Sequence, residues 1–453
     1  MFLVILPLFH TLGLQLLTMI RLSLIVSLLC LQLHVYAQNV EKHITEENVT
    51  RIISTLAADD MMGRSAMRPE HIEKATAFIE SEFKKIGLKP SAGATSFRQS
   101  FQKQLIVPEN LEVTINGVVL PKEKTLLATE NTTTNFTSGL GMLSIDYDTT
   151  IANKRQTLIS KAFMLSRDTS AAFVIVDPAY QEFFGELKGY FGKRMLNNRK
   201  GTKVFVIGNK NIQSYSVKGT QKVESITMTN VVGMIEGKKQ KEEMVVFSGH
   251  YDHIGIRAAI DGDSISNGAD DDASGTTAVI ALADYYKKQK PANRTLIFVA
   301  FTAEEIGGYG SRHFSEQVNP DKVVAMFNIE MIGKPSKWGQ NQAFITGYER
   351  SNFGEILNKN LAGTQFKFNP DPYPKQNLFY RSDNATLARL GVPAHTISTD
   401  EIDIDKFYHT VNDEVETLDM KNIMATIRAI ALSAQSIVNG TDAPTRIDKA
   451  TVK

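Results

Sequence analysis

A series of continuous apolar segments, separated by helical ones, constrains the fold more than any other feature of the sequence. Three of these segments are Met244–Ser248, Arg294–Phe301 and Val323–Ile329. Their apolar residues follow one another without alternation, which is typical of strands that are buried on both faces. Because helical patterns lie between them, the sequence predicts an α/β fold with a mostly parallel or mixed central sheet and helices on both faces.

Further patterns before and after these strands belong to the same arrangement. In residues 70–86, apolar residues recur at intervals of three and four, and Gly87 follows as a stop signal, which indicates an amphipathic helix. Two more strands are predicted at Gln342–Thr346 and Val392–Ile397, and three more helices at Thr276–Tyr286, Ser351–Leu361 and Met420–Val438.

Residues 97–225 have a different composition, rich in Thr, Asn, Lys and Phe, with few histidines or paired acids. Strand-like runs occur at Ala172–Val176 and Lys203–Ile207. Since nothing in this stretch indicates chemistry, we interpret it as a smaller domain inserted into the main one.

The first 37 residues have the pattern of an export signal. Arg21 is their single charged residue, Leu22–Leu33 is apolar, and Val35-Tyr36-Ala37 fits the small-residue rule for cleavage. We therefore predict a signal peptide at residues 1–37, starting at Met1 or Met19, and a secreted or periplasmic mature protein. The alternative is an uncleaved anchor helix, because the whole apolar stretch is long enough to span a bilayer.

The overall composition argues against several classes of partner. Hydrophobic residues make up 42% and charged residues 22% of the chain, which is typical of a globular protein with a large core. The formal net charge is only +1, so the chain lacks the strong field that nucleic acids or anionic membranes attract. We expect no nucleic-acid partner and no stable membrane association after signal cleavage.

Acids and histidines follow the predicted strands at the points where the strands end. Ligands of open α/β sheets bind beyond the carboxyl ends of the strands, so these side chains are expected at one rim of the sheet. The candidates are His250 and Asp252 after the first strand, Glu304 and Glu305 after the second, Glu330 at the end of the third, His409 beyond the last, and Asp271 in a run of acids that opens a helix.

The ligand types favour zinc, because imidazole and carboxylate without thiolate suit that ion, with cobalt or manganese as substitutes. Five candidate ligands exceed what one tetrahedral ion uses, which indicates two ions that share a carboxylate. Two ions about 3.5–4 Å apart can activate a shared water and hold a scissile carbonyl group. Of the adjacent acids Glu304 and Glu305, one can ligate while the other acts as base. The five candidate ligands are His250, Asp271, Glu305, Glu330 and His409.

Each of these groups also has a purely structural interpretation. The run Asp270–Asp272 can cap a helix, Glu304 and Glu305 can be first-turn acids, and His250 can be a structural hydrogen-bonding group. Their joint occurrence after successive strands favours the metal site. No functional role is assigned to His253, His313 and His395, and Trp338 is expected to pack against its neighbours.

Five motifs, taken in order, resemble those of the co-catalytic di-zinc aminopeptidases, a family that includes bacterial aminopeptidase S, yeast aminopeptidase Y and glutamate carboxypeptidase. The motifs are SGHYDHIG, NGADDDASG, FTAEE, NIEMIG and YHTVND. The resemblance implies the zinc exopeptidase fold and an aminopeptidase that acts on peptides. It covers about residues 226–440 and extends weakly to residues 45–90. We accordingly divide the mature chain into residues 38–96 and 226–440 for the catalytic domain, 97–225 for an insert resembling a protease-associated domain or a lid, and 441–453 for a tail.

Carried over by motif position, the resemblance implies a role for each site residue. His250 and Glu330 would bind one zinc ion, Glu305 and His409 the other, and Asp271 would bridge both. Glu304 would be the general base, and Asp252 would orient His250. In the family the peptide after the bridging aspartate is often cis, which here is Asp271–Asp272. Many members carry Asp where this chain has Glu330, an exchange that keeps an oxygen ligand but can alter spacing and metal preference.

Three alternatives share this fold. A glutaminyl cyclase uses one zinc ion, and the second set of ligands argues against it. A glutamate-type carboxypeptidase needs basic residues to hold an acidic C-terminal side chain, for which Arg381 alone is weak support. Receptor-like relatives lose the catalytic residues, whereas the full set is present here.

Overall fold

The computed structural model describes residues 40–452 except 152 and 198–199, so the predicted signal peptide lies outside the described residues. Within the described part of the chain, no helix is both long enough and apolar enough to cross a membrane. The chain divides into two compact units. The large unit comprises residues up to Ser100 together with Met228–Lys453, and the small unit comprises Phe101–Thr227. The composition of the sequence predicts the insert at residues 97–225.

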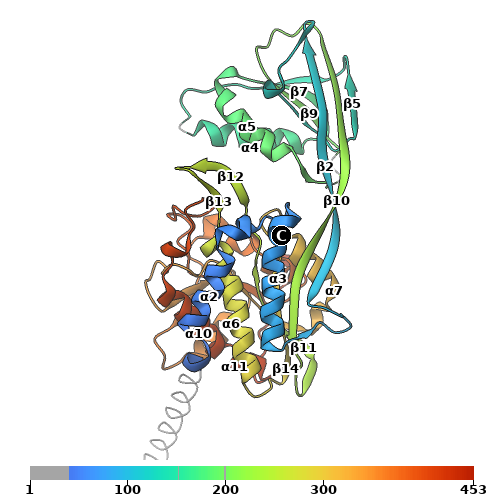
Figure 1. Ribbon diagram of the computed structural model, residues 1–453. Helices are drawn as coiled ribbons and strands as arrows, with labels where there is room; N and C mark the ends of the chain where they lie inside the picture. Colours follow the sequence, from blue (N-terminus) through green and yellow to red (C-terminus); the bar gives the residue numbers. More distant parts are fainter. Residues whose placement is uncertain (1–39, 152, 198–199, 453) are drawn as a thin grey trace, which may run out of the picture. The chain divides into compact units, whose positions relative to one another are not determined.

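A mixed sheet forms the centre of the large unit (Figure 1). Strands β14, β11, β15 and β18 lie side by side and run parallel to one another, whereas β10 and β16 run antiparallel to their neighbours β14 and β18. The predicted α/β fold with a mixed central sheet is therefore confirmed. In sheet order the strands are β17 (Lys367–Pro370), β16 (Gln342–Ile345), β18 (Ala394–Ser398), β15 (Val323–Ile329), β11 (Gln240–His250), β14 (Arg294–Phe301) and β10 (Tyr215–Ile235).

Helices cover both faces of this sheet, which explains why its strands are apolar on consecutive residues. On one face, the ring of Phe247 stacks on those of Phe298 and Phe327, and α6 packs against β11. On the other face, Val246 and Met326 belong to a cluster that includes residues of α7 and α9. Helices α2, α3 and α10 pack against α6 and complete the first layer (Figure 1). The bounds are α2 (Glu46–Leu56), α3 (Pro69–Ile86), α6 (Gly275–Lys288), α7 (Tyr309–Gln317), α8 (Phe353–Asn360), α9 (Asn384–Ala388) and α10 (Met420–Ser433).

The closing helix predicted at Met420–Val438 is not continuous. Helix α10 ends at Ser433, and a short helix, α11 (Gln435–Val438), follows after Ala434. The apolar periodicity continues across this position, because Ile430 and Ile437 are both buried, so the pattern alone does not reveal the break.

The small unit has a core of its own. Its sheet has the order β4-β9-β7-β6, and the predicted strands correspond to the two central members, β7 and β9. Phe184 and Val174 belong to an apolar cluster on the helix-covered face, and Phe173 and Val217 to another cluster. The bounds are β4 (Thr125–Ala128), β6 (Gly141–Ile145), β7 (Ala171–Val176), β9 (Thr202–Ile207), α4 (Lys154–Arg167) and α5 (Gln181–Phe191), and the chain enters and leaves through β2 (Arg98–Ile115) and β10.

The first residue of α6 generates a prediction on stability. A Cβ atom added at Gly275 would lie 2.1 Å from the carbonyl oxygen of Ile329 and 2.4 Å from Asp272 Oδ1. Because backbone cannot give way as a flexible side chain can, we expect Gly275→Ala to lower the free energy of unfolding by about 1–3 kcal/mol. Urea unfolding followed by the fluorescence of Trp338, the only tryptophan, measures this in the large unit.

The matched control is Gly185→Ala on α5, where an added Cβ would meet no described atom within 4 Å. This helical substitution should leave the small unit equally stable or stabilise it, as circular dichroism can show. A Gly275→Ala protein as stable as wild type would contradict the close approach of α6 to β15.

Candidate metal centre

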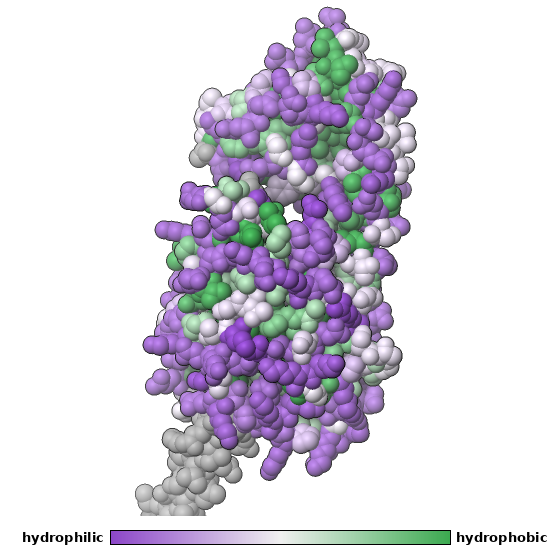
Figure 2. Space-filling model, viewed as in Figure 1, coloured by the Kyte–Doolittle hydropathy of each residue, from purple (hydrophilic) through white to green (hydrophobic). Residues whose placement is uncertain are grey.

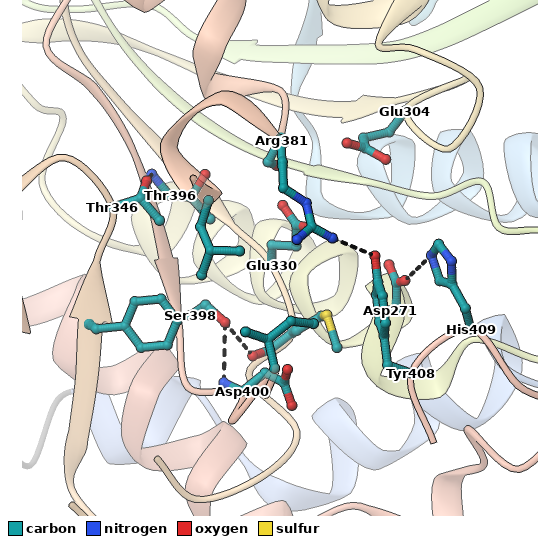
Figure 3. Close-up of a pocket in the computed structure, with 15 residues that line it drawn as sticks. Asp271, Glu304, Glu330, Thr346, Arg381, Thr396, Ser398, Asp400, Tyr408 and His409 are labelled. Atoms are coloured by element: carbon teal, nitrogen blue, oxygen red, sulfur yellow. Dashed lines mark hydrogen bonds and ion pairs between the residues drawn. The ribbon is translucent and has the colours of Figure 1, made fainter. Parts of the chain in front are cut away.

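The acids and histidines identified in the sequence meet at one rim of the central sheet. Strands β14, β11, β15 and β18 are parallel, so their carboxyl ends lie at the same edge. His250 is the last residue of β11, Glu330 directly follows β15, and Glu304 and Glu305 come shortly after β14. Figure 3 shows Asp271, Glu304, Glu330 and His409 around one pocket, as the sequence predicted.

The carboxylate of Asp271 lies at the middle of this group. Its Oδ1 is 3.2 Å from His250 Nε2, and its Oδ2 is 3.1 Å from His409 Nε2. His409 Nε2 is also 3.0 Å from Glu305 Oε2. Asp271 is only 2% exposed, so these polar contacts are made away from solvent.

Two sets of potential metal ligands share Asp271. In each set, one ligand atom per residue lies within 4.8 Å of the others. The first donor set is His250, Asp271 and Glu330, and the second donor set is His253, Asp271 and Glu305. His409 joins the second donor set through its contacts with Asp271 and Glu305. Glu304 belongs to neither donor set.

His253 is the one member of the donor sets for which the sequence predicts no functional role. Its ring is buried, and Nδ1 lies 2.7 Å from Glu305 Oε1 and 3.8 Å from Asp271 Oδ2. The sequence signal for His253 is its position in SGHYDHIG, three residues after His250 at the end of β11. His395 lies outside the centre, where its Nδ1 is 2.8 Å from the carbonyl oxygen of Thr346 and its Nε2 is 2.7 Å from Ser351 Oγ.

Asp252 links the end of β11 to the segment that carries Glu304. Its carboxylate accepts a hydrogen bond from the Glu304 N–H at 3.1 Å. The nearest Asp252 atom to His250 Nδ1 is the carbonyl oxygen at 3.1 Å, and the carboxylate Oδ1 is 3.8 Å away. Both atoms face the ring nitrogen that points away from Asp271. Burial raises the pKa of Asp252 to about 7, although the charge of His250 opposes this shift.

Negative charge is in excess at the centre. Burial, together with nearby carboxylates, raises the pKa of Glu330 to about 7 and that of Glu304 well above its ordinary value, although His250 opposes both shifts. Burial would also raise the pKa of Asp271, but the contacts with His250 and His409 hold it well below its ordinary value. A cation placed between these carboxylates would stabilise their charged forms.

Two buried polar atoms of the donor sets are left without a hydrogen-bond partner in the described part of the chain. Leaving such an atom unpaired costs about 1–3 kcal/mol. A divalent ion between the side chains would engage them together, and zinc is commonly held by imidazole and carboxylate ligands. The residues present therefore fit zinc. The unpaired atoms are His253 Nε2 and Glu330 Oε2.

Two further aspartates hold the backbone around the ligands. The carboxylate of Asp272 accepts hydrogen bonds from the N–H groups of His250, Gly275 and Met331 at 3.0–3.1 Å. Since His250 ends β11 and Met331 follows Glu330 after β15, Asp272 connects the two strand ends that carry ligands of the first donor set. The carboxylate of Asp413 accepts from the N–H groups of Asp270 and Asp271, both at 3.0 Å. The peptide between Asp271 and Asp272 is cis, as the resemblance implied.

A pocket opens beside the donor sets. Arg381 lines it and donates a hydrogen bond to the hydroxyl of Tyr408 at 3.3 Å (Figure 3). The ring of Tyr408 stacks on His409 with 4.0 Å between the ring centroids. The remaining lining includes the carboxylate of Asp400 and is otherwise apolar or carries hydroxyl groups, mainly from Met331, Phe344, Thr346, Leu378, Thr396, Ser398 and Ile402.

The fold and the centre define a metallopeptidase domain of the α/β class. Residues 230–434 match the model of Peptidase family M28. The predicted resemblance to the zinc aminopeptidases is therefore confirmed.

Two relatives illustrate the similarity in sequence. A probable zinc metalloprotease of Leptosphaeria maculans is 31% identical over 27% of this chain and 28% of its own length. Aminopeptidase YwaD of Bacillus subtilis is 23% identical over 49% of this chain and 48% of its own length. The chain thus spans about half or less of the length of these relatives.

Solved structures show the same fold across most of the chain. The aminopeptidase from Aneurinibacillus sp. strain AM-1 has a TM-score of 0.56 at 16% identity, with 92% of this chain and 98% of that chain covered. BSAP, a zinc aminopeptidase from Bacillus subtilis, has a TM-score of 0.53 at 17% identity, with 90% and 99% covered.

The role of Asp272 can be tested without changing a candidate ligand. In Asp272→Asn, an NH₂ group replaces one oxygen that accepts backbone N–H groups, so at least one of the three hydrogen bonds is lost. Because residues that orient metal ligands typically contribute about 10–100-fold to metal affinity, we expect a loss of that size for zinc. Titration of metal-free protein in competition with a chromophoric chelator measures the affinity.

Asp284→Asn is the control, since Asp284 lies on α6 but pairs with Lys288, its Oδ2 being 2.6 Å from Lys288 Nζ. This variant should bind zinc as wild type does. An Asp272→Asn protein with unchanged zinc affinity would show that the three hydrogen bonds do not set the ligand geometry.

Proposed function

We propose that the chain is a zinc aminopeptidase that removes N-terminal residues from peptides and holds two ions. The observation that carries this proposal is the carboxylate of Asp271, which is shared by two donor sets and lines a pocket. His250, Asp271 and Glu330 would hold one ion. Glu305, His409 and Asp271 would hold the other, with His253 as an additional donor. When bound, the ions supply Lewis-acid activation of a water molecule and of the scissile carbonyl group.

Glu304 is the best-placed proton acceptor. It lines the pocket but belongs to neither donor set, so its carboxylate remains available (Figure 3). The hydrogen bond from its N–H group to Asp252 fixes its backbone. Glu304 would take the proton from the attacking water and deliver it to the departing amine.

Tyr408 is placed to donate to the substrate. Arg381 already donates to the Tyr408 oxygen, so the phenolic proton is free to point elsewhere. Burial and the neighbouring charges of Asp271 and Glu305 raise the pKa of Tyr408, so the hydroxyl keeps its proton. A donor beside His409 can stabilise negative charge that develops on the carbonyl oxygen.

Metal content and substrate preference test the proposal together. We expect two zinc ions per chain by elemental analysis, activity on aminoacyl anilides with a free N-terminus, and loss of that activity after chelation. N-blocked versions of the same substrates should be inert. One ion per chain with cyclisation of N-terminal glutamine would instead establish the cyclase, and release of C-terminal glutamate from N-blocked peptides would establish the carboxypeptidase.

The adjacent acids Glu304 and Glu305 should respond differently to the same substitution. Glu304→Gln keeps size but removes basicity, so it should retain both ions and lower kcat by about 10²–10⁴-fold. Glu305→Gln replaces a ligand oxygen by a weaker one, so it should lose affinity for one ion. Each variant is to be measured for metal content and for turnover. Metal loss in Glu304→Gln with full metal content in Glu305→Gln would reverse the two assignments.

We also propose that the protein is exported, on the basis of the apolar N-terminal segment and the cleavage pattern ending at Ala37. The mature chain should then begin at Gln38. N-terminal sequencing of protein from its native host measures this directly. A chain that retains Leu22–Leu33 and sediments with membranes would contradict export as a released protein.

A further inference from the structure

Arg64 is a fully buried cation whose hydrogen bonds go to backbone rather than to acids. The side chain is 0% exposed. Its guanidinium donates to the carbonyl oxygens of Leu56 and Tyr251, both at 2.7 Å, and to those of Asn267 and Gly268. The residue ends the short helical segment Asp59–Arg64, outside the 230–434 range that matches the family model.

Three of these carbonyl groups belong to segments that carry metal ligands. Tyr251 lies directly after His250, and Asn267 and Gly268 lie shortly before Asp271 in the same loop. In addition, the carbonyl oxygen of Arg64 accepts a hydrogen bond from the His253 N–H at 3.2 Å. One residue therefore connects the segment of His250 and His253 to the segment of Asp271.

Arg64 and Asp413 fix the loop that carries Asp271 through complementary groups. Asp413 accepts from the N–H groups of Asp270 and Asp271, while Arg64 donates to the carbonyl groups of Asn267 and Gly268. The N–H groups of this loop are thus bound by the carboxylate of Asp413, and its carbonyl groups are bound by the guanidinium of Arg64. Neither interaction uses a metal-ligand atom.

The backbone conformation at Arg64 is itself unusual. Its φ is 49°, and the two preceding residues, Met62 and Gly63, have φ of 55° and 66°. Left-handed conformations at residues other than glycine cost of order 1 kcal/mol or more and persist where the surroundings impose them. A Cβ added at Gly63 would lie 2.7 Å from Gly255 Cα, so the turn packs tightly against the start of β12 (Gly255–Ile260), two residues after His253.

We propose that Arg64 is a positioning residue of the metal centre, whose guanidinium sets the spacing between the His250 segment and the Asp271 segment and thereby the geometry of both donor sets. This inference rests on the proposed function, because it assumes that the donor sets bind metal. Lysine cannot take the same role, since a single ammonium group lacks the planar fork that reaches several carbonyl groups at once.

Cobalt(II) bound to metal-free protein reports on ligand geometry through its visible absorption spectrum, independently of activity. We expect Arg64→Lys to be folded by circular dichroism, to bind cobalt about 10–100-fold more weakly than wild type and to show an altered spectrum. In Arg64→Gly, the glycine accepts the left-handed backbone and leaves a space the size of a guanidinium ion. Added guanidinium ion, far below denaturing concentration, should restore the cobalt spectrum of this variant.

Arg51→Lys is the matched control. Arg51 belongs to the same N-terminal region and pairs with Glu82 on α3, its Nη2 being 2.6 Å from Glu82 Oε2. Its hydrogen bonds go to Asn48 and Glu82, neither of which belongs to a ligand segment. This variant should bind cobalt with the affinity and the spectrum of wild type.

Cobalt binding by Arg64→Lys with the affinity and spectrum of wild type would overturn the inference, even if the variant were less stable to heat. If Arg64→Lys does not fold, Arg64→Gly decides: restoration of the cobalt spectrum by guanidinium supports the inference, and no restoration overturns it. A wild-type protein that binds no cobalt would overturn the proposed function as well, which distinguishes the two failures.

Discussion

The carboxylate of Asp271 must lie between two histidines while it is almost completely removed from solvent. Its oxygens are 3.2 Å from His250 Nε2 and 3.1 Å from His409 Nε2. A buried carboxylate is costly unless it is paired and hydrogen-bonded, and here its neighbours include further acids. The rest of the large unit can be understood as the arrangement that brings these groups together and holds them there.

Two levels of structure meet this requirement. Parallel strands place His250 and Glu330 at one rim, with Glu304 and Glu305 close behind, because neighbouring parallel strands end at the same edge. The loops are then fixed by buried charges that bond to backbone groups. Asp272 binds the backbone at the ends of β11 and β15. In the loop that carries Asp271, Asp413 binds N–H groups and Arg64 binds carbonyl groups. Because other residues hold the loops, the ligand side chains are available to a metal ion.

This division explains which features could be predicted from the sequence. The strands Arg294–Phe301 and Val323–Ile329 were predicted with the observed bounds, since burial on both faces leaves a continuous apolar pattern. The gathering of acids and histidines at one rim followed from the order of strands. The break between α10 and α11 was missed because Ala434 fits the helical pattern on both sides.

Other site features were missed for a different physical reason. Asp272, Asp413 and Arg64 bind mainly backbone groups, most of them distant in sequence, and backbone groups carry no sequence signal. His253 contacts the carboxylate of Glu305, which is also distant in sequence. The hydrogen bonds of Arg64 go to backbone carbonyl groups, so no acidic residue type in the sequence indicates its role. Its segment, within residues 45–90, also resembles the family only weakly. Residue types thus predicted which side chains gather at the centre, whereas the contacts that fix their geometry required the three-dimensional structure.

The central claim is that two ions lie on either side of the Asp271 carboxylate. Anomalous diffraction at the zinc edge, from crystals of unchelated protein, tests it most directly. The account predicts two anomalous peaks about 3.5–4 Å apart, one beside His250 and Glu330 and one beside Glu305 and His409, with Asp271 between them. A single peak, or two peaks that do not share Asp271, would contradict it.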